Sequence, residues 1–491
     1  MNPSRLFPFT ALLTLLLVSA GCAVGPHYKR PTAAVPPAFK EQPPVNFKEA
    51  EAAGWKQSQP GDAYSKGRWW ELYNDAALNA LEEQVGVSNQ NVLEAEAQYR
   101  QARAAVSVAR AAVLPVVTAD PAAAVGGPGD RKSFSLPFNV AWEPDLWGNI
   151  RRGVTASAAT AQSLAASVGN ARLLYQAELA QDYFGLHGND TEAELLTRTE
   201  ASYKEYLTLT QNRFSAGIAS DLDVAQAETQ LYFVQSQLMD LGVERAALEH
   251  GIAILTGKAP AELGIPPVTL TAAPPPVPLG VPSELLERRP DIAAAERQVA
   301  AANEQIGIAI AAFYPTLTLS ATGGVQSSAL KNLLDWPSRF WSVGPSISET
   351  VYDGGLRRAT VNQYIATYNA NVAAYRQSVL VAFEQVEDSL AAVRILSQQI
   401  LRQQEAVNSS QTFLRLESTR YESGIDPYID VVTAQTTLLS NRQMLTNMQV
   451  QEMTASIQLI EALGGGWDRS QLPTPVQITQ LPTKSETAIQ H

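Results

Sequence analysis

Two periodicities of apolar residues alternate along this chain, and they meet at prolines. From Asp291 to Ala312 the chain is rich in alanine and apolar at helical spacing, which predicts a helix. After Pro315, apolar and polar residues alternate over Thr316–Ser320, which predicts a strand. Because proline cannot continue a helix and restricts the preceding residue to extended geometry, the helix must end before Pro315.

The same junction occurs once more, nearer the N-terminus. Pro115 stands 200 residues before Pro315, and the residues around the two prolines match at that offset, as Glu96 matches Glu296. An offset this large indicates a duplicated unit of domain size and not a short solenoid repeat. The pattern therefore predicts two copies of one order: a helix, a pair of strands and a long helical hairpin.

The strand pairs are predicted at 115–147 and 315–353. In the first pair, small or polar residues alternate with five apolar ones, namely Phe134, Leu136, Phe138, Val140 and Trp142. Such a strand fits the lipid face of a β-barrel, where one side is apolar and the other polar. An antiparallel hairpin packed on a soluble core fits the same alternation.

Each copy continues into a long helical hairpin. The expected long helices are 155–212 and 359–416, the turns are 215–222 and 422–429, and the returning helices end at Leu255 and Leu463. The first long helix would measure about 87 Å, and Gly185 and Gly188 leave a bend in its middle open. In the second long helix the apolar residues step mainly by threes and fours, as in a coiled coil: Ile365, Tyr368, Val372, Tyr375, Val379, Phe383, Val386, Leu390, Val393, Leu396 and Ile400.

The N-terminus predicts a signal peptide at residues 1–21. Arg5 precedes an apolar run, and small residues come immediately before Cys22. The run is too short to cross a membrane as a helix. Cys22 is the only cysteine, so no intramolecular disulfide can form, and a thiol kept at this place indicates modification. Ordinary cleavage next to an incidental cysteine is the alternative.

The remaining chain divides at changes of composition. Residues 22–67 are rich in proline and should be extended over the surface or act as a tether. Repeat 1 spans 68–273 and repeat 2 spans 274–463, and a C-terminal tail at 464–491 should be irregular, either equatorial or disordered. Within repeat 1, Asp75 is the expected N-cap of a helix that runs to Ala112.

Composition narrows the class of protein. The chain has 491 residues, more than the ~250–300 at which single cores stop growing. Charged residues make up 17%, below the ~25% usual in soluble domains, which favours long helices of modest polarity. The net charge is −12 without a basic stripe, so we expect no nucleic-acid partner.

The strand count predicts an oligomer. One chain supplies four strands, whereas outer-membrane barrels begin at ~8. Open strand edges are not tolerated in lipid, because each unpaired backbone group costs several kcal/mol. Several chains would therefore have to pool strands. Two chains would leave an interior filled by side chains and three would leave a lumen; the long helices favour a conduit, and hence three.

The two helical turns match each other at an offset of 207 residues. Arg213–Ile218 reappears as Arg420–Ile425, with Tyr421 beside the second arginine, and Asp223 reappears as Asp430. A glycine in each turn supplies the left-handed residue that ends the first helix.

Four acids follow these turns, and two interpretations are open for them: Asp221, Asp223, Asp426 and Asp430. Acids in the first turn of a helix cap free N–H groups and complement the helix dipole. If the turns instead form the mouth of a symmetric tube, each acid is repeated around the axis as a carboxylate ring that attracts cations and repels itself. Contacts with Arg213, Arg420 and Tyr421 would then open or tighten that ring. Both interpretations can hold for one residue.

No catalytic pattern stands out. His27, His187, His250 and His491 are scattered without metal-ligand spacing, so no metal site is expected. The stretch Gly251–Ala259 is one residue too long for a phosphate loop and ends on Ala in place of Ser or Thr. We therefore expect neither an enzyme nor a bound cofactor.

Several motifs resemble those of the TolC-type outer-membrane efflux channels, in the OprM-like lipoprotein branch of the tripartite RND efflux systems. The motifs are Trp69-Trp70, Val281–Leu286, Arg288–Ile292, Ala295-Glu296, Ala311–Pro315, the Cys22 signal and the two Arg-aromatic-x-x-Gly turns. The signal resembles that of bacterial lipoproteins, although Ser19 stands where leucine is usual. Ala23 follows the cysteine where inner-membrane lipoproteins have Asp, which points to the outer membrane.

The resemblance implies a mainly helical mixed fold: a periplasmic α-barrel of antiparallel coiled-coil helices and a twelve-stranded transmembrane β-barrel built by a homotrimer. It implies lipid on Cys22 and a location in the outer membrane extending into the periplasm. It also implies docking to a periplasmic membrane-fusion adaptor and an inner-membrane RND pump. At the closed entrance, Asp430 matches the first position of the family's acidic ring, Thr433 replaces the second acid, and Asp426 stands where some relatives are basic.

These observations favour a passive gated conduit that exports small toxic compounds or drugs. A type I protein-secretion duct would use the same architecture. A coiled-coil lipoprotein that tethers envelope layers without conducting is the alternative from a different class.

Overall fold

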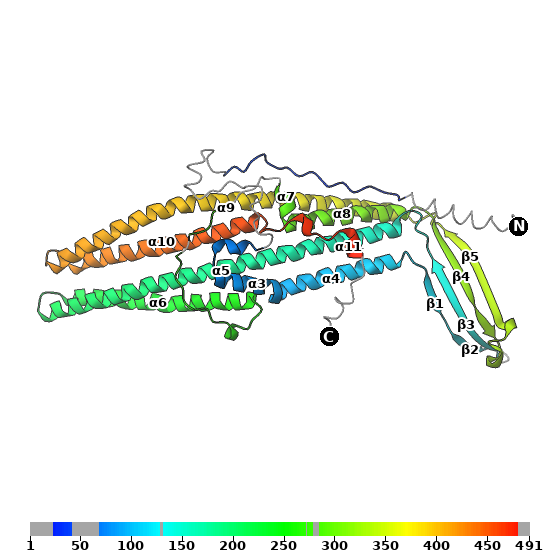
Figure 1. Cartoon of the computed structure of the whole chain (residues 1–491), viewed down its shortest axis with the longest axis horizontal. Helices are drawn as coiled ribbons and strands as arrows, with labels where there is room; N and C mark the ends of the chain where they lie inside the picture. Colours follow the sequence, from blue (N-terminus) through cyan, green and yellow to red (C-terminus); the bar gives the residue numbers. More distant parts are fainter. Residues whose placement is uncertain (1–22, 42–67, 128–130, 272, 278–283, 480–491) are drawn as a thin grey trace.

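The computed structural model describes residues 23–41, 68–127, 131–271, 273–277 and 284–479. They form an elongated molecule in which long helices run side by side and one antiparallel sheet stands at one end (Figure 1). The predicted signal peptide and Cys22 lie outside the described residues. Within the described part of the chain, no helix combines the length and the apolar character needed to cross a membrane.

The long helices come in three pairs of equal length. Helices α4 and α8 have 22 residues each, α5 and α9 have 67, and α6 and α10 have 35. Their bounds are Gln90–Ala111 (α4), Pro290–Ala311 (α8), Asn149–Ser215 (α5), Leu356–Glu422 (α9), Asp221–Leu255 (α6) and Tyr428–Ala462 (α10). The shorter helical elements are η2 (Trp69–Tyr73), α3 (Ala76–Ser88), η3 (Pro260–Glu262), α7 (Leu285–Arg288), η5 (Leu330–Asn332), η6 (Trp336–Ser338), η7 (Arg469–Gln471) and α11 (Pro475–Thr479). The paired lengths confirm the duplicated unit.

The first helix of repeat 1 is shorter than expected. Asp75 caps α3, and its Oδ1 accepts hydrogen bonds from the N–H groups of Ala77 (2.8 Å) and Leu78 (3.0 Å). The expected continuation to Ala112 is wrong, because Asn89 interrupts it. The Asn89 side chain caps α4 and also donates to the carbonyl of Leu255 at 3.0 Å. An asparagine that satisfies N–H groups outside a helix thus divides one predicted helix into two.

The middle of α5 is continuous helix through both glycines that left a bend open. Gly188 lies against α10, where a Cβ atom would come within 2.2 Å of Val450 Cγ2. At Gly185 a Cβ atom would meet Leu248 at an ordinary 3.7 Å. The absence of a side chain at Gly188 therefore allows α5 and α10 to pack closely.

The sheet joins the strand pairs of both repeats. Its strands are β1 (Val116–Ala119), β2 (Ala122–Gly126), β3 (Arg131–Trp142), β4 (Thr316–Ser327) and β5 (Arg339–Ser348). Their order is β1-β3-β4-β5, all antiparallel, with β2 also paired to β3. Strands β1 and β2 together form the first arm of the sheet, which was expected as one strand. The arm is interrupted at Asp120 and Pro121, but β1 and β2 pair with β3 in the same register. Pro121 and Pro137, which lies opposite Asp120, both lack an N–H group, which explains the interruption.

The register places apolar residues on one face of the sheet. Phe138 lies opposite Gly323, and Gly323 lies opposite Trp341. The neighbouring rung of the other face holds Asn139, Thr322 and Ser342. The alternation predicted for one strand thus extends across the sheet. Its apolar face is uncovered within one chain, since Trp341 is 80% exposed.

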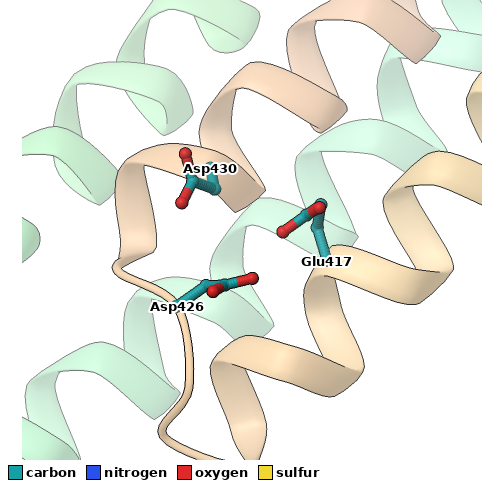
Figure 2. A group of neighbouring side chains, drawn as sticks. All are labelled: Glu417, Asp426 and Asp430. Atoms are coloured by element: carbon teal, nitrogen blue, oxygen red, sulfur yellow. The ribbon is translucent and has the colours of Figure 1, made fainter.

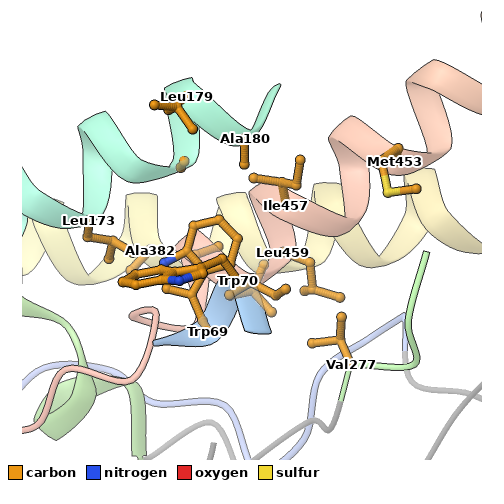
Figure 3. Packing of buried hydrophobic residues seen from close by; sticks show 14 of the residues in the cluster. Trp69, Trp70, Leu173, Leu179, Ala180, Val277, Ala382, Met453, Ile457 and Leu459 are labelled. Atoms are coloured by element: carbon orange, nitrogen blue, oxygen red, sulfur yellow. The ribbon is translucent and has the colours of Figure 1, made fainter. Parts of the chain in front are cut away.

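The main core lies halfway along the helices. Trp69 and Trp70 of η2 are 1% and 4% exposed and pack edge to face, with ring centroids 6.0 Å apart. Figure 3 shows them against side chains of α5, α9 and α10. The middle of the predicted α9 stripe is buried in this cluster, including Tyr375, Val379 and Leu390.

The two terminal segments wrap this helical body. Residues 23–41 run extended along α8 and α9, where the N–H groups of Lys40 and Glu41 donate to Glu387. The C-terminal segment differs from the irregular tail expected, because it forms η7 and α11. Ile478 of α11 packs on α4 and α5 and is 1% exposed, so apolar burial orders the tail as far as Thr479.

Candidate functional site

Two turns of the same construction lie at the end of the molecule opposite the sheet (Figure 1). The first turn, residues 216–220, joins α5 to α6, and the second turn, residues 423–427, joins α9 to α10. In each, a glycine has positive φ, 75° at Gly217 and 72° at Gly424. The next N–H then returns to an arginine carbonyl: Ile218 to Arg213 at 2.8 Å and Ile425 to Arg420 at 2.9 Å. This is the helix ending that glycine permits.

Asp223 is used to cap a helix. Its carboxylate accepts from the N–H and the hydroxyl of Ser220, both at 2.8 Å, while the Ser220 hydroxyl accepts from the Asp223 N–H. This reciprocal pair is a capping box. Asp221 is exposed in the same first turn of α6. Helix capping therefore describes Asp223, while Asp221 stands in the first turn, where an acid complements the helix dipole.

Asp430 has the matching place in α10 but different surroundings. Its N-cap residue is Pro427, which has neither an N–H nor a hydroxyl to donate, so no capping box can form. Its carboxylate instead lies beside those of Glu417 and Asp426, and oxygen atoms of the three acids are within 4.8 Å of one another. Figure 2 shows these three side chains, contributed by α9, the second turn and α10. We call Glu417, Asp426 and Asp430 the acidic cluster.

Arg420 offsets part of the charge in the acidic cluster. Its guanidinium binds Asp426 through two nitrogens, with Nη2 to Oδ1 at 2.9 Å, and this contact lowers the pKa of Asp426. Partial desolvation, a hydrogen bond with Asp426 and the nearby carboxylate charges raise the pKa of Glu417. Three carboxylates at this spacing could hold a cation within a single chain. The sequence analysis expected cations to be attracted only by acids repeated around an axis and expected no metal site.

Arg213 connects the two helical hairpins. It donates to the carbonyls of Tyr421 (2.8 Å) and Glu422 (2.7 Å) at the end of α9, and its guanidinium lies 4.4 Å from the centre of the Tyr421 ring. Tyr421 and Tyr428 are both buried, with ring centroids 5.3 Å apart. Arg213 therefore ties the first hairpin to carbonyls in the last turn of α9, where the Tyr421 carbonyl also accepts from the Gly424 N–H at 2.9 Å.

The structure sorts the predicted residues into three groups. Asp426, Asp430 and Arg420 meet on the second hairpin, Arg213 and Tyr421 meet between the hairpins, and Asp221 and Asp223 remain on α6. Thr433, at the second ring position, donates to the carbonyl of Ile429 in its own helix (2.9 Å). The sequence analysis missed Glu417. Its signal was its place three residues before Arg420, on the same face of α9.

Comparisons with known proteins agree with this architecture. The family model described as "Outer membrane efflux protein" matches residues 81–258 and 281–465. The solvent efflux pump outer membrane protein SrpC of Pseudomonas putida is 30% identical over 468 residues, covering 93% of this chain and 98% of the relative. The outer membrane protein OprJ of Pseudomonas aeruginosa is 31% identical over 484 residues, covering 94% of this chain and 96% of the relative.

A solved structure shows the same fold over nearly the whole length. The outer-membrane channel OprN superposes with a TM-score of 0.84 at 29% identity, covering 91% of this chain and all of that one. None of these three proteins is named as an enzyme. With a family model that matches both repeats and relatives that match from end to end, this chain belongs to the outer membrane efflux protein family.

Proposed function

We propose that three copies of this chain form a gated conduit through the outer membrane, as the exit channel of a tripartite efflux pump. The single observation that carries this proposal is the sheet, whose apolar face is uncovered and whose edge strands β1 and β5 have no second neighbour among the described residues. With β1 and β2 counted as one interrupted strand, each sheet has four strands. Three such sheets would supply the edges that each of them lacks and make a twelve-stranded barrel. Helix α5 adds a stem of about 100 Å.

The entrance of the conduit is the end that carries the two turns. Around a three-fold axis, Glu417, Asp426 and Asp430 would repeat and repel one another, while Arg420 would hold Asp426 in place. Arg213 would keep the two hairpins of each chain together. Asp430 is the acid best suited to a gate, because no capping box occupies its carboxylate.

Lipid on Cys22 would anchor the trimer. The described chain begins at Ala23, and the N–H of Val24 donates to the carbonyl of Trp147 at 3.1 Å, where the sheet joins the helices. A lipid on the preceding residue would thus enter the membrane at the level where the sheet begins. The extended segment that follows then runs toward the middle of the helices (Figure 1).

The cargo we propose is small toxic compounds. The relatives are named for solvent, toluene and antibiotic efflux. The pump, with its periplasmic adaptor, would supply energy and most of the selectivity, while this chain opens and conducts. A protein-secretion duct and a non-conducting tether are the competing functions.

Single-channel conductance of the purified protein, measured together with its mass in the same detergent, tests the conduit. We expect a trimer with a small conductance that polyvalent cations block. Asp430→Ala should change the closed-state conductance or the cation block, whereas Asp223→Ala, which removes a capping acid, should leave both unchanged. A stable monomer without conductance would leave the tether as the better function.

A further inference from the structure

A hydrogen-bonded chain crosses three strands on the polar face of the sheet, far from the acidic cluster. Thr118 Oγ1 and Asn139 Nδ2 donate to Asp120 Oδ2, at 3.1 Å and 2.8 Å. Thr322 Oγ1 donates to Asn139 Oδ1 at 2.9 Å. The chain thus runs from β1 through β3 to β4 and ends on a carboxylate.

This arrangement requires Asp120 to be an acceptor. Because the Asn139 oxygen receives the Thr322 hydroxyl, its NH₂ group points at Asp120, and an ionised carboxylate offers only acceptors to it. Asp120 also stands where two prolines interrupt the pairing of the first arm with β3, so its position is set by backbone as well as by side chains.

The charged side chains described in the sheet are unevenly placed. Asp120 belongs to the polar face, with Asn139, Thr322 and Ser342. Lys132 and Arg339 are on the apolar face by alternation, and Arg339 stacks 4.3 Å from the centre of the Trp336 ring. The conduit proposed above turns the apolar face to lipid and the polar face to the lumen.

On the basis of that conduit, we propose that Asp120 sets the charge preference of its membrane-embedded part, favouring cations, including organic ammonium compounds, over anions. Three-fold symmetry places three fixed carboxylates at one level of the lumen, where charged rings select ions. This level is separate from the gate, because the sheet and the turns lie at opposite ends of the molecule (Figure 1). Opening the gate would leave this preference in place.

The reversal potential of single channels between unequal KCl solutions measures this preference. Asp120→Asn keeps the shape of the side chain and removes all three carboxylates of the ring. It should lower the cation-to-anion permeability ratio by more than about threefold, because a single unit charge across ~6 Å of water-like medium already changes the occupancy of one monovalent ion by that factor. Glu262→Gln makes the same charge change on the helical body and should retain the wild-type ratio.

A second variant keeps the test decisive if Asp120→Asn fails to assemble. Ser342→Arg adds positive charge to the same face without removing a hydrogen bond of the chain, and it should also lower the ratio. Unchanged reversal potentials in conducting trimers of these variants would mean that Asp120 only ties β1 to β3. A wild-type protein that does not conduct would instead overturn the conduit itself, so the two failures are distinguishable.

Discussion

At the scale of single residues, Glu82 is a buried acid without a partner. The side chain of this α3 residue is fully buried, and neither carboxylate oxygen has a hydrogen-bond partner among the described residues. Burial alone raises the pKa of Glu82 well above its usual range. The folded protein therefore holds a proton that the unfolded chain releases, so this residue makes the fold less stable as the pH rises from about 4.3, the ordinary value for Glu.

Glu82→Gln should accordingly stabilise the protein at neutral pH. We expect a gain of up to about 3.5 kcal/mol at pH 7, because keeping the acid protonated costs ~1.4 kcal/mol for each pH unit above its ordinary pKa of about 4.3 and glutamine takes up no proton. The gain should shrink as the pH falls toward the ordinary carboxyl pKa. Thermal unfolding followed by circular dichroism at several pH values measures it. Glu83→Gln is the matched control, since Glu83 is exposed and paired with Arg68. An equal shift from both variants would contradict the role of burial.

The candidate site also depended on single residues. Asp223 and Asp430 occupy equivalent places in the matched turns, so the pattern alone left capping and gating open for both. What separates them is the residue three positions earlier, Ser220 in one copy and Pro427 in the other. This difference can be seen in the sequence once the first residues of α6 and α10 are known. Glu417 could not be assigned to this site from the sequence, because the fold of the hairpin is what brings α9 beside the second turn and the start of α10.

At the scale of elements, the helices show which boundaries can be predicted from local sequence and which cannot. The prolines at 115 and 315 marked both helix-to-strand changes, because a missing N–H acts locally whatever the surrounding fold. The break at Asn89 was missed because its side chain bonds to Leu255, which is 166 residues away. Likewise α11 is ordered by contacts with α4 and α5, which no local pattern reveals.

The contact of α5 with α10 yields a prediction at this scale. Gly188→Ala places a Cβ atom 2.2 Å from Val450, a stiff β-branched side chain, and should destabilise the protein by about 1–3 kcal/mol, as overpacking does. Gly185→Ala has ordinary room and should stabilise it by about 0.5–1 kcal/mol through helix propensity. Denaturant unfolding of the two variants compares them. Equal stability of both would show that the helices separate to admit a methyl group.

At the scale of the whole molecule, the order of elements prescribes how copies can join. The helices lie side by side in two rows that share α5 and α9: α4, α5, α8, α9 and α6, α5, α10, α9. One lateral edge of the molecule is therefore formed by α4 and α6, and the other by α9. The strands follow the same order from repeat 1 to repeat 2, with β1 and β2 at one edge of the sheet and β5 at the other. Both layers therefore join copies head to tail, which closes into a ring when the rotation per copy divides a full turn.

Cysteine cross-linking across these edges tests the ring and its number of chains. Within one chain, β1 and β5 are separated by two strands, so Val117 and Val343 lie roughly 14 Å apart at ~4.8 Å per strand, too far for a disulfide. Any disulfide between Val117→Cys and one of Trp341→Cys, Val343→Cys or Ile347→Cys must therefore join two chains. Val117→Cys alone controls for the native thiol.

The pattern of cross-linked products then discriminates the possible assemblies, because the largest product counts the copies in a closed ring. Complete oxidation of a three-fold ring ends at the mass of three chains, whereas a two-fold ring ends at two and an open assembly gives a continuing ladder. We expect one of the three registers to yield the trimer, since neighbouring strands bring facing Cβ atoms within about 5.5 Å of one another. Absence of cross-links in all three registers would mean that β5 does not pair with β1 of another copy. The uncovered apolar face would then need a different partner, and both the lumen and the proposed position of Asp120 within it would be lost.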